Sequence, residues 1–260
     1  MIKRKIENSP IIYYINSDKH SEWVLFLHAA FVNHNMFKSQ VEYFKDKYNV
    51  MTLDILGHGE SIDTQKGDSI EKMSLWMKEI LDNENIQKIH IVGVSLGSVI
   101  AQDFANKYPG YVQSLSCFGG YDINNFDEQM QKENGAAQMG MMLKALVSVK
   151  WFSKANMKIS AFTQKAQQDF YEMNIKFPKK SFMYLASLNK LVNVCEPQRR
   201  EYPLLIGCGE HDMPMELEAV KMWEKTEDNC SVIVFKDAGH CVNMDTPESF
   251  NKELEEFWTM

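Results

Sequence analysis

The chain alternates short apolar runs with longer segments in which apolar residues recur at helical spacing. The short runs are rich in Val, Ile, Leu and Phe, which favours strands, while the longer segments predict amphipathic helices. This alternation is typical of a mostly parallel sheet with helices on both faces. The predicted strands span residues 11–15, 23–27, 49–53, 89–94, 114–118, 204–208 and 232–235, and the accompanying helices span 35–47, 69–81, 96–107 and 247–258.

The alternation stops in the middle of the chain. Residues 121–197 contain no convincing strand, but they are rich in Met, Phe, Tyr and Lys and predict a helical insertion with helices at 125–132, 136–149, 163–175 and 179–192. We therefore expect an α/β core made from residues 1–120 and 199–260, interrupted by a helical unit over residues 121–198. The core is discontinuous in sequence.

Composition and charge indicate an ordinary globular protein. The 260 residues are 45% hydrophobic and 24% charged, as in ordinary globular proteins. The 28 Lys and Arg against 35 Asp and Glu give a net charge of −7, so we expect no nucleic-acid partner. No stretch approaches the ~20 apolar residues of a membrane span.

The cysteine pattern and the N-terminal sequence indicate the cellular compartment in which the protein is expected. The five cysteines are scattered and show no C-x-x-C pair, which favours reduced thiols over disulfides or a zinc site. The basic start of the chain is not followed by the apolar run of an export signal. A cytoplasmic protein is expected.

A candidate nucleophile stands at the end of one predicted strand. Residues 89–98 read as a buried strand, then G-x-S-x-G, then the start of a helix, which is the context that this motif requires. The sharp turn places Ser95 in a strained backbone conformation, while Gly93 and Gly97 permit close backbone approach. By itself, the pattern could also be a glycine-flanked serine that tightens a turn.

A serine hydroxyl needs a base, and imidazole has a suitable pKa. Of the seven histidines, His240 directly follows the last predicted strand and so opens onto the same sheet edge as Ser95. His90 lies inside a strand and is interpreted as a packed residue. His20 and His34 are expected at the surface or in loops.

The imidazole in turn needs a carboxylate that orients it and stabilises its protonated form. Asp212 follows the strand at 204–208 and is the preferred candidate. Glu210 in the same loop and Asp122, after the strand at 114–118, remain alternatives. Asp212 could instead cap a helix that begins at Pro214.

A tetrahedral oxyanion requires two N–H donors. The backbone N–H of Leu96 is one expected donor, and the loop after the strand at 23–27 supplies the other, with Ala30 preferred over Phe31. His28, at the start of that loop, is expected to brace it by hydrogen bonding.

Together these stretches resemble the α/β-hydrolase fold family, in its serine hydrolase branch with a helical cap. The oxyanion loop at His28, the D-x-x-G-H-G-x-S segment from Asp54 to Ser61, the serine elbow, Asp212 and His240 follow the family's order and spacing. The resemblance implies an eight-stranded, mostly parallel sheet, with the insertion as a cap that shapes the substrate pocket. Ala29, where the family usually has Gly, departs from the pattern. The serine argues against the branches that use an aspartate nucleophile.

The expected activity is that of a serine hydrolase that cleaves a carboxylic ester, lactone or thioester through an acyl-enzyme on Ser95. The alternatives are a ligand-sensing receptor with slow hydrolysis, or a carbon–carbon bond hydrolase or perhydrolase of the same fold. A non-catalytic scaffold is less favoured, because that role would not explain why the candidate nucleophile, base and acid each follow a predicted strand.

Neither a metal nor a cofactor is expected, since no H-E-x-x-H cluster or G-x-G-x-x-G loop occurs. The aromatic and Met side chains of the insertion favour a small apolar ester-like substrate, although most of them are expected to pack the insertion onto the core. They are Met139, Met141, Met142, Trp151, Phe152, Phe162, Phe170, Tyr171, Phe182 and Tyr184.

Overall fold

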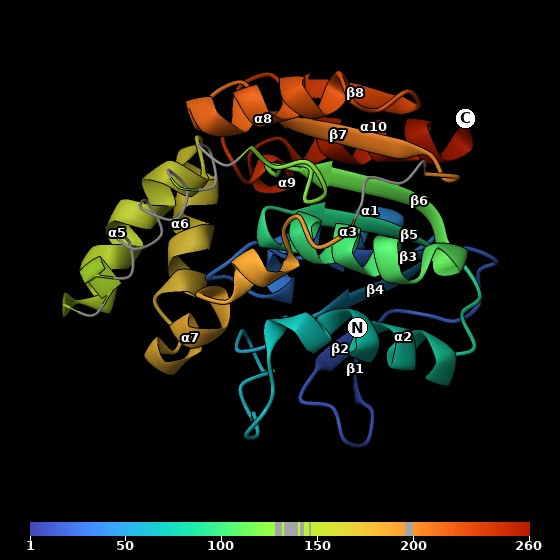
Figure 1. Ribbon diagram of the computed structural model, residues 1–260, viewed down its shortest axis with the longest axis horizontal. Coiled ribbons are helices and arrows are strands. Elements are labelled where there is room, and N and C mark those ends of the chain that lie inside the picture. The colour runs from blue at the N-terminus through green and yellow to red at the C-terminus, as the bar shows by residue number, and fades with distance from the viewer. Residues whose placement is uncertain (128–131, 133–139, 141–142, 146, 196–199) are drawn as a thin grey trace.

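Eight strands form one sheet in the computed structural model, which describes residues 1–127, 132, 140, 143–145, 147–195 and 200–260 (Figure 1). The strand order is β1-β2-β4-β3-β5-β6-β7-β8, and all neighbours from β4 to β8 are parallel. The strands are β1 (Ile2–Lys5), β2 (Ile12–Ile15), β3 (Trp23–Leu27), β4 (Asn49–Leu53), β5 (Ile89–Val94), β6 (Val112–Phe118), β7 (Leu204–Gly209) and β8 (Cys230–Phe235).

The central strands are buried on both faces, so their sequences are continuous apolar runs that are easy to recognise. The edge strand β1 was not predicted. Its residues are largely exposed and three of the four are basic, as is common in edge strands, where charged side chains discourage pairing with another chain. Its antiparallel pairing with β2 puts charged side chains on the open edge.

Helices cover both faces of the sheet, as expected. The helices α2 (Met73–Asn83), α3 (Leu96–Lys107) and α8 (Pro214–Glu224) contribute to one hydrophobic cluster. The helices α1 (Lys38–Phe44) and α10 (Pro247–Thr259) contribute to the other. The short α9 (Val242–Asp245) leads into α10. For α8, the sequence indicated only a possible start at Pro214, and its extent was not predicted.

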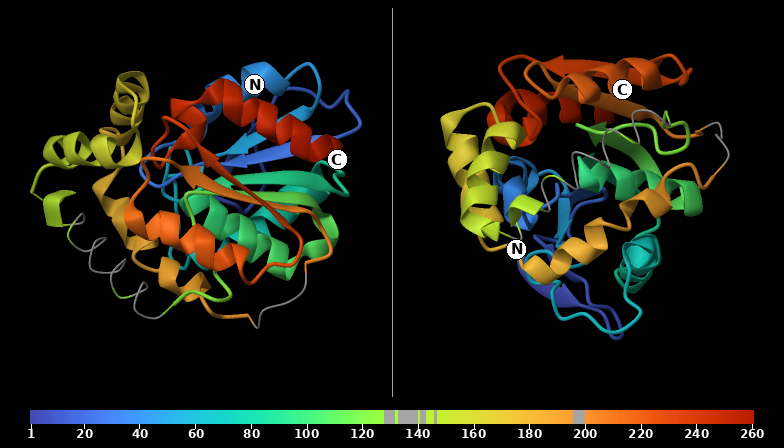
Figure 2. Two further views of the ribbon diagram at one scale, coloured as in Figure 1. Left: turned by 90° about the horizontal axis from the view of Figure 1, so that it is seen from above. Right: turned by 60° about the vertical axis from the view of Figure 1, so that its left-hand side comes forward.

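Between β6 and β7 the described chain forms helices that stand beside the sheet (Figures 1 and 2). The prediction at 163–175 is confirmed by α6 (Gln164–Asn174). The prediction at 179–192 is only partly right, because α7 (Phe182–Leu185) lies between two short three-ten turns. The helix α5 (Val149–Ser160) was not predicted; its start is capped by the Ser148 side chain, which accepts a hydrogen bond from the Trp151 N–H.

Half of the residues in each of the predictions at 125–132 and 136–149 lie outside the described residues. Of the described ones, 125–127 are not helical, whereas 132, 140, 143–145, 147 and 149 are helical. None of the helices in the part of the chain that the structure describes combines the length and the apolar character needed to cross a bilayer.

Candidate active site

The turn between β5 and α3 holds Ser95 in a strained conformation. Its φ of 53° and ψ of −116° lie outside the regions that a non-glycine residue ordinarily adopts. The Ser95 N–H donates to the Phe118 carbonyl over 2.8 Å, which ties the turn to the end of β6. The surrounding sheet therefore holds the strained turn in place.

The two glycines of the G-x-S-x-G sequence are needed for steric reasons. A Cβ on Gly93 would collide with the Gly97 carbonyl, and a Cβ on Gly97 would collide with the Leu27 carbonyl at the end of β3. The helix can start this close to the sheet only because both side chains are absent. This is the close backbone approach that the sequence predicted.

His240 and Asp212 are hydrogen bonded to each other. His240 Nδ1 lies 2.9 Å from Asp212 Oδ1, and both side chains are buried. His240 follows β8 and Asp212 follows β7, so the parallel register brings them to one edge of the sheet. Asp212 Oδ1 also accepts from the Met213 N–H over 2.8 Å, while Oδ2 is buried without a hydrogen-bond partner among the described residues.

Electrostatics favour the protonated form of His240. Burial alone would lower its pKa, but the negative charge of Asp212 and the hydrogen bond to it outweigh burial and raise the pKa to about 9. An imidazole in this setting binds a proton strongly. A proton taken from a nearby hydroxyl would therefore be held well.

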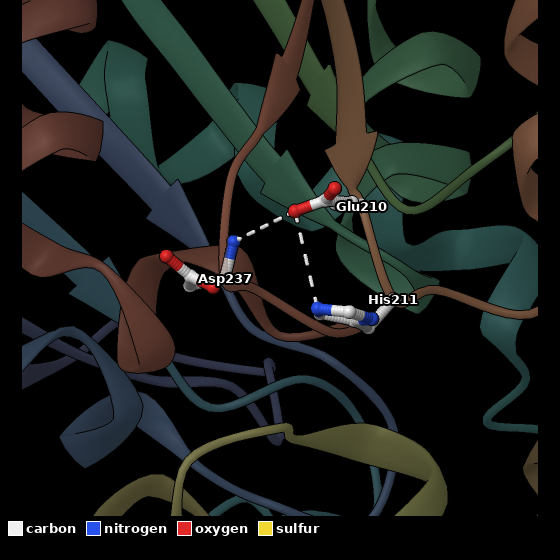
Figure 3. Close-up of side chains that lie close together, drawn as sticks. All are labelled: Glu210, His211 and Asp237. Atoms are coloured by element: carbon white, nitrogen blue, oxygen red, sulfur yellow. Dashed lines mark hydrogen bonds and ion pairs between the residues drawn. The ribbon is translucent and has the colours of Figure 1, made fainter.

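The two alternative acids are engaged elsewhere. Asp122 accepts a hydrogen bond from the Asn124 N–H over 3.0 Å and lies 3.5 Å from the Arg200 guanidinium. Glu210 is exposed; it accepts a hydrogen bond from the Asp237 N–H over 3.3 Å and lies 3.9 Å from His211 (Figure 3).

The other histidines have local partners. His90 is buried, with Nδ1 2.7 Å from Ser114 Oγ, as expected of a packed residue. His34, expected at the surface or in a loop, is instead only 18% exposed and lies 2.8 Å from the buried Asp54 carboxylate. The backbone of His20 pairs with Asn49.

The loop after β3 brings Ala30 and Phe31 toward the elbow. His28 bonds to the Ala29 carbonyl through Nδ1 over 2.7 Å and accepts from the Ile55 N–H through Nε2 over 2.9 Å. This arrangement requires a neutral ring, and burial lowers the pKa of His28 to about 4. His28 thus braces the loop, as predicted.

A cavity of about 250 Å³ lies where these loops meet the insertion. Its lining brings together the nucleophile, base and oxyanion candidates Ser95, His240, Ala30 and Leu96 with a largely apolar wall. The remaining lining residues are Ala29, Phe31, Val99, Gly119, Gly120, Tyr121, Asn156, Ile159, Ser160, Phe170, Phe182, Leu185, Ala186, Leu188, Met213, Met215 and Glu216.

Of the seven aromatic residues named in the insertion, two line the cavity, two others are buried, two are exposed and one is half-buried, so a majority in packing is not observed. Phe170 and Phe182 line the cavity, Phe152 and Tyr184 are buried, and Trp151 is 53% exposed. Phe162 is exposed and Tyr171 half-buried, while Met139, Met141 and Met142 lie outside the described residues.

Several cavity residues were not predicted from the sequence, and two of them, Gly119 and Glu216, bear on the site. Gly119 follows β6 with a φ of +57°, a conformation that favours glycine, and a Cβ there would lie 3.0 Å from His240 Nδ1, closer than an ordinary contact. Glu216 is a buried carboxyl on α8. The Gly119-Gly120 pair after a strand was a signal for the first. The second had no signal, because only the start of α8 at Pro214 was considered and the face that it buries was not predicted.

Among the described residues, Glu210, His211 and Asp237 could together offer ligand atoms to a metal (Figure 3). All three are exposed, and none of them lines the cavity. Exposed acidic clusters are common without an ion, so we assign no metal to this group.

Comparison with known proteins supplies the class. The family model described as alpha/beta hydrolase fold matches residues 22–247, most of the chain. The protein therefore belongs to the α/β-hydrolase fold family, in agreement with its sheet and serine elbow.

The individual relatives share low sequence identity with this chain. The chain is 26% identical over 246 residues to 3-oxoadipate enol-lactonase 1 of Acinetobacter baylyi, covering 91% of this chain and 88% of the relative. It is 22% identical over 254 residues to a human monoacylglycerol lipase, covering 92% and 75%. Among solved structures, an esterase from Thermogutta terrifontis matches with a TM-score of 0.79 at 18% identity, covering 99% and 97% of the two chains.

Proposed function

We propose that this protein is a serine hydrolase that cleaves carboxylic esters through an acyl-enzyme on Ser95. The observation that carries the proposal is the buried His240–Asp212 pair, whose histidine shares one cavity with the strained Ser95. The curated relatives include an enol-lactonase, a monoacylglycerol lipase and a carboxylesterase, which are hydrolases of ester-like bonds and support the same reaction class.

In the proposed mechanism, His240 takes the proton of Ser95 as the serine oxygen attacks the ester carbonyl. The N–H groups of Leu96 and Ala30 donate to the tetrahedral oxyanion. When the intermediate collapses, the carbon–oxygen bond breaks and the alcohol leaves with the proton from His240. Water, deprotonated by His240, then attacks the acyl-enzyme and releases the acid, and the proton returns to Ser95.

The insertion is proposed to be the cap of this site, over residues 121–198, with the core formed by residues 1–120 and 199–260. Phe170 on α6 and Phe182 on α7 line the cavity together with the core residues Ser95 and His240. The cavity volume and apolar wall suit a small ester better than a long lipid chain.

A serine-to-alanine variant tests the proposal directly. Ser95→Ala is expected to reduce kcat for an activated aryl ester by roughly three orders of magnitude or more, since the nucleophile is gone. A fluorophosphonate probe should label the wild type and not this variant. The matched control is Ser231→Ala, an exposed serine on β8, which should leave hydrolysis unchanged.

Full hydrolytic activity in Ser95→Ala would overturn the proposal. Sustained steady-state turnover by the wild type also separates an enzyme from a ligand-sensing receptor. A receptor would release about one equivalent of product per chain and then stop.

A further inference from the structure

Glu216 is a carboxyl in the reaction cavity that the proposed mechanism does not use. It lies on the first turn of α8, just beyond the loop that carries Asp212, and only 6% of its surface is exposed. Its Oε2 atom is buried and has no hydrogen-bond partner among the described residues. The cavity lining therefore includes a buried carboxyl, and nothing in the described chain donates to its Oε2 atom.

Glu216 lies in a largely apolar cavity, and the positively charged group that acts on it is His240. Met213, Met215 and Leu188 line the same cavity, and none of the described lining residues is Lys or Arg. Burial raises the pKa of Glu216 to about 7; the positive charge of His240 opposes this shift, and the negative charge of Asp212 adds to it.

Buried polar atoms in folded proteins are nearly always hydrogen bonded, so an unpaired one in a cavity marks a place where a ligand can supply the partner. A carboxyl oxygen accepts a hydrogen bond whether the group is ionised or neutral. A substrate hydroxyl can donate without carrying a full charge into an apolar space, whereas an ammonium group would have to lose its hydration. A substrate carboxylate would be repelled by an ionised Glu216, and no Lys or Arg among the described lining residues would offset that repulsion.

We propose that Glu216 determines specificity by accepting a hydrogen bond from a substrate hydroxyl, so that the preferred substrates are small hydroxylated esters. This inference rests on the proposed ester hydrolysis at Ser95 and adds the substrate class. Esters that carry a free carboxylate are the disfavoured class.

The experiment compares small esters that differ in one polar group. Ethyl butanoate is the apolar reference, hydroxyethyl butanoate and ethyl hydroxybutanoate place a hydroxyl on the alcohol and acyl sides, and monoethyl succinate carries a carboxylate. With acid release followed by titration, at least one hydroxylated ester should exceed ethyl butanoate in kcat/KM by about tenfold, mainly through KM. Monoethyl succinate should fall below the reference.

Variants assign that preference to Glu216. Glu216→Met removes the acceptor, and the ratio of kcat/KM between the hydroxylated and apolar esters should fall to about one. Glu216→Gln keeps an acceptor oxygen and should retain most of the ratio. Glu218→Gln is the matched control, because Glu218 is exposed on the same helix, and its ratio should equal that of the wild type.

The inference fails if the wild type shows no preference for either hydroxylated ester, a result that needs no variant to fold. It also fails if Glu216→Met lowers kcat/KM for all esters by the same factor, which indicates a merely structural role. Failure of the proposed function looks different: Ser95→Ala would then hydrolyse ethyl butanoate as fast as the wild type.

Discussion

At the scale of single residues, the site is defined by which polar groups have partners. Asp122, Glu210 and Asp212 all follow strands at the same edge of the sheet, but only Asp212 is hydrogen bonded to His240. Asp122 and Glu210 are held by Asn124 and by the backbone of Asp237 instead. Asp122 and Glu210 therefore make local hydrogen bonds, whereas Asp212 is proposed to take part in catalysis.

Asp212→Asn tests this distinction. The amide cannot stabilise a protonated His240, so kcat should fall by roughly three to four orders of magnitude. Asp122→Asn is the control and should change kcat by less than about tenfold. Steady-state hydrolysis of an aryl ester by the two folded variants decides between the acids, and a severe loss in Asp122→Asn alone would reverse the assignment.

The raised pKa of His240 predicts the pH dependence. A general base acts in its neutral form, and the group titrates about 9, above the ordinary value of 6.5. Hence kcat/KM should rise with pH throughout the neutral range, reach half its maximum at about pH 9 and level off above that value. The profile is measured with a neutral ester, corrected for spontaneous hydrolysis. A rate that is flat above pH 6.5 would contradict the prediction.

At the scale of elements, the insertion is joined to the oxyanion loop by aromatic packing. Phe31, which has a positive φ of 71°, lies with its ring centroid 5.0 Å from that of Phe152 on α5. Its ring also lies 5.2 Å from Phe177 and 5.5 Å from Phe182. The loop that carries a proposed oxyanion donor is thereby packed against the elements that form the proposed cap.

Adjacent aromatic residues on α5 provide a matched test of this junction. Phe152 is 1% exposed, so Phe152→Ala should lower the free energy of unfolding by roughly 3 to 5 kcal/mol. Trp151 is 53% exposed, and Trp151→Ala should stay within about 0.5 kcal/mol of the wild type. Urea denaturation measures both. A loss in Phe152→Ala as small as the one expected for Trp151→Ala would show that the junction does not stabilise the fold.

At the scale of the whole molecule, buried neutral histidines make stability depend on pH. His58 is fully buried in the loop after β4, its Nδ1 lies 3.1 Å from the Leu56 carbonyl, and its ring packs 4.7 Å from Phe177. Burial, followed by the charge of His28, lowers the pKa of His58 to about 3. In the unfolded chain His58 binds a proton near pH 6.5, whereas in the folded chain it does so only near pH 3.

Stability from His58 is therefore present above pH 6.5 and is lost as the pH falls toward 3. Between pH 7 and 5 the loss should amount to about 2 kcal/mol. Glu216 acts in the opposite sense, because its raised pKa makes the folded chain bind a proton more tightly. The test therefore compares the wild type with His58→Gln in urea at both pH values. The variant should lose about 2 kcal/mol less, and identical losses would contradict the assignment.

Strand positions and the serine elbow could be predicted because their causes are local. A strand buried on both faces needs a continuous apolar run, as in residues 89–94, and the elbow needs glycines on both sides of Ser95. The helices of the insertion were harder to predict. Its helices α5 and α7 depend on caps and on packing against the core, which leave only a weak periodic signal.

By itself, the sequence determined the α/β class, the strands that carry the candidate residues and the order of Ser95, Asp212 and His240. Only the tertiary structure decided that Asp212 pairs with His240, that Gly119 makes room for that ring, and that Glu216 is buried unpaired in the same cavity. The reason is physical. Periodicity and steric rules act between neighbours in the chain, whereas hydrogen-bond pairing and burial depend on segments far apart in sequence that meet only in the folded molecule.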